Sequence, residues 1–101
     1  MLQIGKVKIE NKLILAPMAG ITNLPYRLIV KDEGCGLVVS EMVSAIALIR
    51  SGQKTRNLLN SDSYEKPFSV QLFGSEPQIM AEAAKIIEGF GADILDVNMG
   101  C

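Results

Sequence analysis

The sequence predicts an α/β protein in which helices cover a parallel β-sheet, and two observations support this class. Short, nearly all-apolar runs alternate along the chain with longer segments of helical period. Strands that are apolar along most of their length are typical of parallel sheets, because helices cover the faces of such sheets. Each run is bounded by glycine, proline or a charged residue. We therefore expect strands at residues 13–16, 37–40, 68–72 and 93–97.

The clearest helix is expected from Ser75 to Phe90. Ser75 and Gln78 have the spacing of a capping box, and Pro77 falls in the first turn, where no intrahelical donor is needed. Glycines near the end of the segment, Gly89 and Gly91, are expected to end the helix. An apolar stripe at helical spacing is formed by Ile79, Ala83, Ile87 and Phe90.

An earlier helix is expected from about Asn23 or Leu24 to Glu33. Thr22 or Asn23 caps its start, and Gly34 ends it. The opening residues, 1–12, are expected to form a hairpin or an extended lead-in to the first strand.

A third helical segment is expected over residues 44–60. Ser51 and Gly52 break it, because neither residue favours a helix interior.

Helical and strand periods alone do not separate a doubly wound sheet from a (β/α)₈ barrel. No dinucleotide-binding fingerprint follows the first expected strand, since "APMAGITNLP" contains a single glycine. This favours the TIM barrel, which needs roughly 250 residues when complete. The four expected strands would be about half of such a barrel, so residues 1–101 are expected to be a fragment of one. Such a fragment would expose open sheet edges, through which it could associate.

Composition narrows the classes of function. Ten basic and eleven acidic residues give a net charge of −1, so no overall basic field marks the chain for nucleic-acid binding. The cysteines, Cys35 and Cys101, form no C-x-x-C pair and the chain has no histidine, so neither a metal site nor a disulfide is expected. The chain shows neither a signal peptide nor a run of membrane-spanning length, and we expect a cytoplasmic protein without a membrane partner.

Unusual polar or flexible residues lie at the end of every expected strand. In parallel α/β architectures the active site gathers at the carboxyl ends of the strands. The four segments therefore predict an active site at one edge of the sheet. They are "APMAG" (16–20), "SEM" (40–42), "VQLFG" (70–74) and "NMGC" (98–101).

These motifs, in the order "LAPMAGITNLPYR", "VSEM", "VQLFG" and "DVNMGC", closely resemble the N-terminal part of bacterial tRNA-dihydrouridine synthases, over essentially the whole chain. The resemblance implies an FMN-binding TIM-barrel catalytic domain, whose remaining part and whose helical tRNA-binding domain lie outside residues 1–101. It also implies an enzyme that uses NADPH to reduce particular uridines in tRNA to 5,6-dihydrouridine. The isolated chain is expected to be inactive.

By the resemblance, Cys101 is the catalytic residue. Hydride passes from reduced FMN to C6 of uracil, and the Cys101 thiol gives a proton to C5. A thiol suits this role because its ordinary pKa of about 8.5 keeps it protonated near neutrality and still acidic enough to donate. Asn98 is expected to contact the substrate base, since its carboxamide both donates and accepts; the alternative is an asparagine that ties down its own turn.

The resemblance assigns the remaining site residues to the cofactor. Gln71 is expected to contact the pyrimidine portion of the flavin, with a structural hydrogen bond to a neighbouring strand as the alternative. Pro17, Met18 and Ala19 are expected to act mostly through backbone amides and carbonyls beneath the isoalloxazine ring, with Met18 offering a flat, polarizable surface. The alternative is a strand-end turn packed by a core methionine. Glu41 either orients a ligand, pairs with an arginine or caps the next helix.

Two other functions remain open at this level. A dihydroorotate dehydrogenase-like enzyme would use FMN on a free pyrimidine or another small molecule, but its N-x-S-C-P-N pattern differs from this chain at Gly100. A non-catalytic half-barrel that serves as an interaction module is the alternative of a different class.

Overall fold

A parallel sheet built around one central strand forms the middle of the structure. The computed structural model describes residues 1–50 and 52–100. Strand β5 pairs in parallel with β3, β4 and β6. The strands of this sheet are β3 (Val38–Val39), β4 (Val43–Ser44), β5 (Phe68–Phe73) and β6 (Ile94–Val97).

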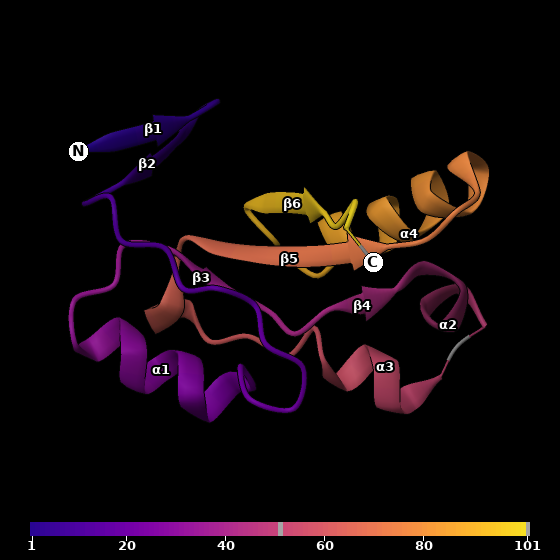
Figure 1. The fold of residues 1–101 in the computed structure, drawn as a ribbon, viewed down its shortest axis with the longest axis horizontal. Helices are drawn as coiled ribbons and strands as arrows, with labels where there is room; N and C mark the ends of the chain where they lie inside the picture. The colour runs from indigo at the N-terminus through magenta and orange to yellow at the C-terminus, as the bar shows by residue number, and fades with distance from the viewer. Residues whose placement is uncertain (51, 101) are drawn as a thin grey trace.

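Strand β6 lies along one edge of β5, and β3 and β4 follow one another along the other edge (Figure 1). The register requires this arrangement, because Ser69 pairs with both Val39 and Ile94 and a strand has only two edges. Leu72 pairs likewise with one residue of β4 and one of β6. Strands that follow one another in the sequence are therefore neighbours in space.

The strand expected at residues 13–16 is wrong. Ile14 forms only an isolated parallel bridge with Leu37, supported by a 2.9 Å hydrogen bond from the Leu15 amide to the Leu37 carbonyl. The described residues place no further strand on the outer edge of this segment, and Pro17 has no N–H with which to extend the ladder.

Strand β4 was not expected, because Ser44 stands where a helical segment was predicted to begin and Val43 lies outside every predicted strand. Pairing with the end of β5 holds these residues extended instead. The Ser44 hydroxyl then accepts a hydrogen bond from the Ala47 amide at 3.3 Å and caps the helix that follows.

The break expected in the segment 44–60 is confirmed in part. Helices α2 (Ala45–Ile49) and α3 (Gln53–Asn57) lie on either side of it, and Gly52 is the N-cap of α3. Ser51 lies outside the described residues.

Helix α1 (Leu24–Asp32) agrees with its prediction to within a residue. The Asn23 side chain accepts a hydrogen bond from the Tyr26 amide at 3.1 Å, and Gly34 follows the helix with φ 103°. A positive φ of this size favours glycine, which explains where the helix ends.

Helix α4 (Pro77–Gly89) is also present, but its predicted capping box is wrong. The N-cap is Glu76, and it makes no side-chain capping bond. The helix therefore begins one residue later than the box between Ser75 and Gln78 requires.

The opening of the chain forms the hairpin, not the extended lead-in. Strands β1 (Leu2–Ile4) and β2 (Val7–Ile9) pair antiparallel, and Gly5 in their turn has φ 57°. A short 3₁₀ helix, η1 (Ser63–Glu65), precedes β5.

The side chains of β5 divide the molecule into an apolar and a polar side. Phe68, Val70 and Leu72 alternate with Ser69 and Gln71, so the two sets point to opposite faces of the sheet. The apolar set belongs to the buried core, and the polar set lies on the face that we call the polar face. The other core members are Val38, Val43, Ala45, Leu48, Leu59, Ala83 and Ile87.

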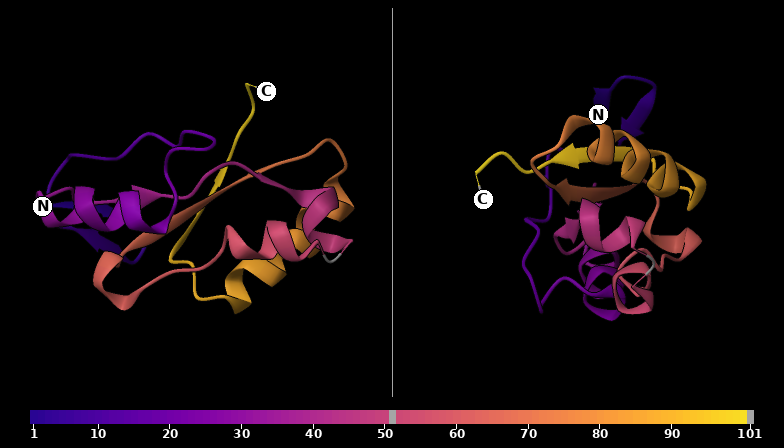
Figure 2. Two further views of the ribbon diagram at one scale, coloured as in Figure 1. Left: turned by 90° about the horizontal axis from the view of Figure 1, so that it is seen from below. Right: turned by 90° about the vertical axis from the view of Figure 1, so that its right-hand side faces the viewer.

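The α/β class and the parallel sheet are confirmed. Among the strands that the structure describes, the order matches the sequential order of a TIM barrel and shows no reversal of the kind found in a doubly wound sheet. Within the described residues the sheet is open, and Figure 2 shows the chain leaving it beyond β6. The half-barrel therefore stays a prediction.

A buried ion pair joins α1 to η1. The Arg27 guanidinium donates to both Glu65 carboxylate oxygens at 2.8 and 3.1 Å, and the two side chains are 2% and 0% exposed. Arg27 also donates to the carbonyl oxygens of Thr22 and Asn60, each at 2.8 Å, and lies 4.7 Å from the centre of the Phe68 ring. One side chain thus connects α1, η1, β5 and the loop before α1.

We expect Arg27→Met to lower the free energy of unfolding by about 3–5 kcal/mol, because it leaves the Glu65 carboxylate buried without its cation. Denaturant titration of the variant and the unchanged protein measures the difference. The matched control, Lys54→Met, removes a cation from the exposed face of α3 and should change stability by less than about 0.5 kcal/mol. Equal losses in the two variants would contradict a special role for the buried pair.

Candidate functional site

Side chains from β5 and β6 form a hydrogen-bonded cluster on the polar face. Gln71 and Asp96 are direct partners in the strand register, and the Gln71 Nε2 donates to Asp96 Oδ2 at 2.7 Å. Asn98 Nδ2 donates to Gln71 Oε1 and approaches the Met42 sulfur, both at 3.3 Å. The cluster lies toward the carboxyl ends of the strands, where ligand sites of parallel α/β proteins are found.

Ser40 connects this cluster to the segment that follows β3. Its hydroxyl accepts from the Gln71 amide at 3.1 Å and donates to the Glu41 carbonyl at 2.7 Å. Ser40 is fully buried and Gln71 is 9% exposed, so these bonds satisfy polar groups that water does not reach freely.

The expected "APMAG" motif forms a tight turn, and hydrogen bonds among nearby residues of the same segment stabilise its backbone. Met18 donates its amide to the Thr22 hydroxyl at 3.1 Å, and the Met18 carbonyl accepts from the amides of Ile21 and Thr22, each at 3.0 Å. Gly20 lies in the turn with φ 75°. Because both backbone groups of Met18 are engaged in the turn, its side chain is the part that remains available to a ligand.

Glu41 joins this turn to the polar cluster. Its Oε1 accepts a 2.6 Å hydrogen bond from the Gly20 amide. Of the roles expected for Glu41, pairing with an arginine and capping of a helix are both absent among residues 1–50 and 52–100. The carboxylate holds the turn against the end of β3, so a chain of hydrogen bonds runs from Gly20 through Glu41 and Ser40 to Gln71.

The structure thus brings together motifs from three strand ends and the turn before α1. Gln71 makes the bond to a neighbouring strand that was its structural alternative. Asn98 ties down its own turn, because its Oδ1 accepts from the Gly100 amide at 2.9 Å. These bonds leave hydrogen-bonding capacity on both carboxamides. Cys101 lies outside the described residues.

Sequence reasoning missed Asp96 and Thr22 as members of the site, and it gave Ser40 and Met42 no individual role beyond their place in "SEM" (40–42). A signal for Asp96 was present, because it precedes Asn98 by two residues in a strand and therefore shares its face. The strand-end position of "SEM" placed Ser40 and Met42 at this edge, but no local pattern could identify their partners, which are 31 and 56 positions away.

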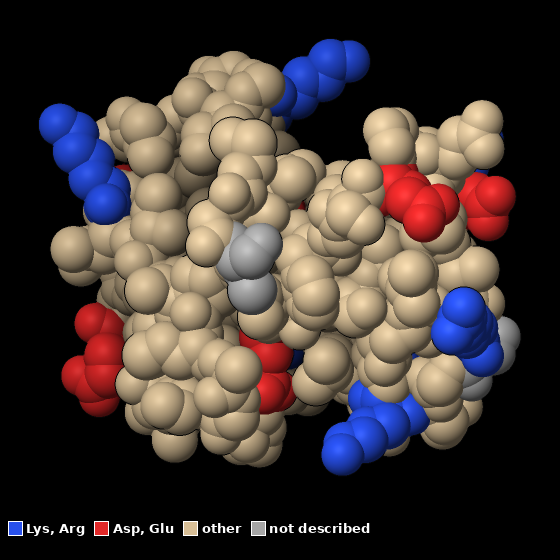
Figure 3. Space-filling model, turned by 45° about the vertical axis from the view of Figure 1, so that its right-hand side comes forward, with Lys and Arg blue, Asp and Glu red and all other residues tan. Residues whose placement is uncertain are grey.

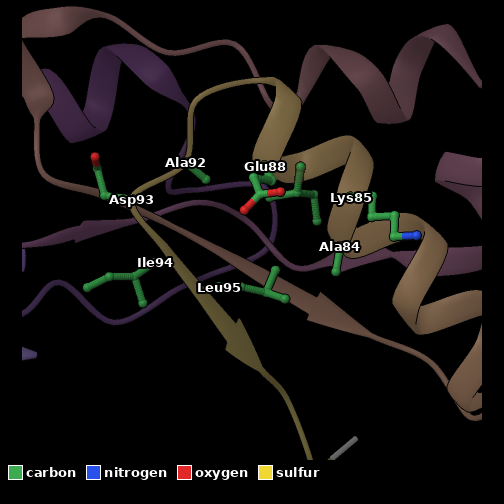
Figure 4. Close-up of a pocket in the computed structure, with 8 residues that line it drawn as sticks. Ala84, Lys85, Glu88, Ala92, Asp93, Ile94 and Leu95 are labelled. Atoms are coloured by element: carbon green, nitrogen blue, oxygen red, sulfur yellow. The ribbon is translucent and has the colours of Figure 1, made fainter. Parts of the chain in front are cut away.

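Two grooves lie elsewhere on the surface. The first, of about 250 Å³, separates α4 from β6, and Figure 4 shows Ala84 and Leu95 facing one another across it. The second, of about 340 Å³, lies beyond the ends of β4 and β5, between Ser44 and Phe73. Neither groove is lined by Gln71, Asp96 or Asn98.

On the face shown in Figure 3, acidic and basic side chains are scattered among uncharged residues. Within residues 1–50 and 52–100, no three His, Cys, Asp or Glu side chains are grouped so that they could hold a metal ion. The same residues include no helix that is long and apolar enough to span a membrane.

The fold and the cluster define an α/β protein with a candidate ligand site at the carboxyl ends of sequential parallel strands. Residues 14–101 match the family model described as "Dihydrouridine synthase (Dus)". The chain belongs to the dihydrouridine synthase family, which confirms the resemblance read from its motifs.

Curated relatives agree along the whole chain. A probable tRNA-dihydrouridine synthase of Rickettsia conorii is 46% identical and covers 100% of the chain. The tRNA-dihydrouridine synthases B of Pseudomonas aeruginosa and Vibrio cholerae are 44% and 42% identical over 98% and 99% of it. The chain spans only 31%, 30% and 31% of the length of these three relatives.

We expect Glu41→Ala to loosen the turn at Gly20, because the Gly20 amide loses its charged acceptor. Hydrogen exchange of that amide should become about tenfold faster or more, as the loss of a charge-assisted hydrogen bond implies. Glu41→Gln retains an acceptor and should give an intermediate rate. Glu82→Ala, an exposed change on α4, should leave the amide unchanged; an unaltered rate in Glu41→Ala would show that the bond does not hold the turn.

Proposed function

We propose that the protein containing this chain reduces specific uridines in tRNA to 5,6-dihydrouridine, with FMN as the flavin and NADPH as the reductant. The observation that carries the proposal is the pair of carboxamides, Gln71 and Asn98, which come from neighbouring strands and meet on the polar face of a chain of this family. The relatives' names, which refer to tRNA, support the choice of substrate.

The chemistry of the cluster fits a flavin. Gln71 uses one N–H toward Asp96 and one oxygen lone pair toward Asn98, which leaves it one donor and one acceptor. The pyrimidine portion of a flavin has an imide edge, on which an N–H lies beside carbonyl oxygens. Gln71 would bind this edge, and the polarizable Met18 side chain would lie beneath the ring with Pro17 and Ala19.

The uracil base requires a second set of contacts. Asn98 Oδ1 keeps one lone pair beyond its bond to Gly100, and we assign this atom to the N–H of the substrate base. Bound FMN, reduced by NADPH, would supply the hydride that C6 accepts. Cys101 would give the proton to C5, and the bond between Gly100 and Asn98 fixes the turn immediately before it.

Residues 1–101 would form the N-terminal part of a TIM-barrel catalytic domain. The sequential order of the parallel strands supports this division, as does the share of the relatives that the chain covers. The groove between α4 and β6 is lined partly by apolar side chains, as expected where a further barrel element packs.

Binding of tRNA would depend largely on residues beyond this chain. Phosphate contacts need clustered Lys and Arg side chains, whereas this chain has a net charge of −1 and scattered charges on the face shown in Figure 3. A helical domain outside residues 1–101 would supply those contacts. A tRNA substrate would place the protein in the cytoplasm.

The test uses the complete protein with NADPH and unmodified tRNA, and dihydrouridine is measured by mass spectrometry. Cys101→Ala should lower the rate about 100-fold or more, because general-acid catalysis contributes at least that factor, while the bound flavin remains visible in the absorption spectrum. The matched control is Cys35→Ala, since the Cys35 thiol donates to the carbonyls of Leu13 and Leu37 and packs against the core, apart from the polar cluster. Its rate should be unchanged.

A full rate in Cys101→Ala would refute the role of the thiol. A flavoprotein that reduces no tRNA but turns over free pyrimidines would refute the tRNA substrate and favour the dihydroorotate dehydrogenase-like alternative.

Residues 1–101 alone should associate and retain FMN poorly, because the edge of β6 and the adjacent groove are exposed. Gel filtration with light scattering measures the mass, and absorbance of the same peak measures flavin. Leu95→Lys should reduce association, because Leu95 lines the groove and is 38% exposed. Ile29→Lys is the control, since Ile29 is 65% exposed on α1. A stable monomer with one flavin and a cooperative melt would contradict this expectation and support an independent half-barrel module.

A further inference from the structure

We propose that Asp96 is a positioning residue: its carboxylate fixes the orientation of the Gln71 carboxamide and, through it, that of Asn98. The proposal rests on the proposed function for the identity of the ligand. It rests on the geometry of the polar face for the role of Asp96.

An ionised carboxylate only accepts hydrogen bonds. Asp96 Oδ2 lies 2.7 Å from Gln71 Nε2, a short distance typical of a charge-assisted bond. The opposite orientation of the amide would place Gln71 Oε1 against the carboxylate oxygen, and the two acceptors would repel. Asp96 therefore selects the orientation in which Nε2 points toward β6.

The orientation of the Gln71 carboxamide determines how Asn98 can contact it. With Nε2 directed to Asp96, Oε1 faces Asn98 Nδ2 at 3.3 Å and accepts its hydrogen. Asn98 in turn directs its Oδ1 to the Gly100 amide at 2.9 Å. If Gln71 were reversed, two NH₂ groups would face each other and this contact would be lost.

The four groups form a chain in which every donor points toward the carboxylate. Gly100 donates to Asn98, Asn98 donates to Gln71, and Gln71 donates to Asp96. Hydrogen bonds aligned in one direction polarise and strengthen one another. The chain starts at the residue next to Cys101 and ends at an acidic side chain, so Asp96 determines which donor and which acceptor Gln71 presents to a ligand.

Strand pairing by itself does not require this carboxylate. The backbone ladder joins four residues of β5 to four of β6, and the Asp96 residue is exposed. At the other end of the same strand pair, Asp93 offers a comparison, because its Oδ2 accepts from the Phe68 amide at 2.8 Å and lies 3.2 Å from Lys66 Nζ. Asp93 is likewise a carboxylate between β5 and β6, but it lies away from Gln71.

The experiment compares Asp96→Asn with Asp93→Asn in the complete protein. An asparagine at 96 both donates and accepts, so it tolerates either orientation of Gln71. We expect Asp96→Asn to raise the FMN dissociation constant about tenfold and to shift the visible flavin spectrum, with little change in melting temperature. Asp93→Asn should lower the melting temperature and change the dissociation constant less than about twofold.

Selective ¹⁵N labelling of glutamine gives a readout that needs no flavin. In the protein without FMN, the side-chain NH₂ resonances of Gln71 should shift in Asp96→Asn and stay in place in Asp93→Asn. Unchanged Gln71 resonances, or parallel losses of stability and affinity in both variants, would overturn the role of Asp96. If the unchanged protein binds no FMN, the proposed function fails, and the resonances still decide whether Asp96 orients Gln71.

Discussion

The pairing of β5 with neighbours on both edges is the constraint on which the rest of the structure depends. Its register with β6 places Val70 beside Leu95 and Gln71 beside Asp96, so apolar and polar side chains of the two strands fall on opposite faces together. A shift by one residue would turn Gln71 into the core and Val70 out of it. The buried core against α4 therefore holds the register that assembles the polar cluster.

A second network connects the loop before α1 to this sheet. The buried Arg27 binds Glu65 and the Thr22 carbonyl, and the Thr22 hydroxyl in turn holds Met18. Glu41 holds the same turn from the side of β3. The turn is thus fixed from two directions by groups that lie outside it, as a preorganised ligand site requires.

The site combines structural and candidate binding roles in the same side chains. Gln71 and Asn98 satisfy one another and the strand ends, and each retains part of its hydrogen-bonding capacity. Such double use is compatible with a ligand site at the carboxyl ends of parallel strands. The two grooves lie beside α4 or beyond the strand ends, so they do not coincide with the polar cluster.

The sequence by itself determined the α/β class, α1 and α4 to within two residues, and the central and last strands, because these elements carry strong local patterns of apolar spacing. At α1 the capping residue Asn23 added to this pattern. Its motifs also identified the family. Only the tertiary structure decided that residues 13–16 form a single bridge, that Val43 and Ser44 form a strand, and that Asp96 meets Gln71. Those outcomes depend on pairing between distant segments, and the register of such pairing is set by the packed core, which no local pattern specifies.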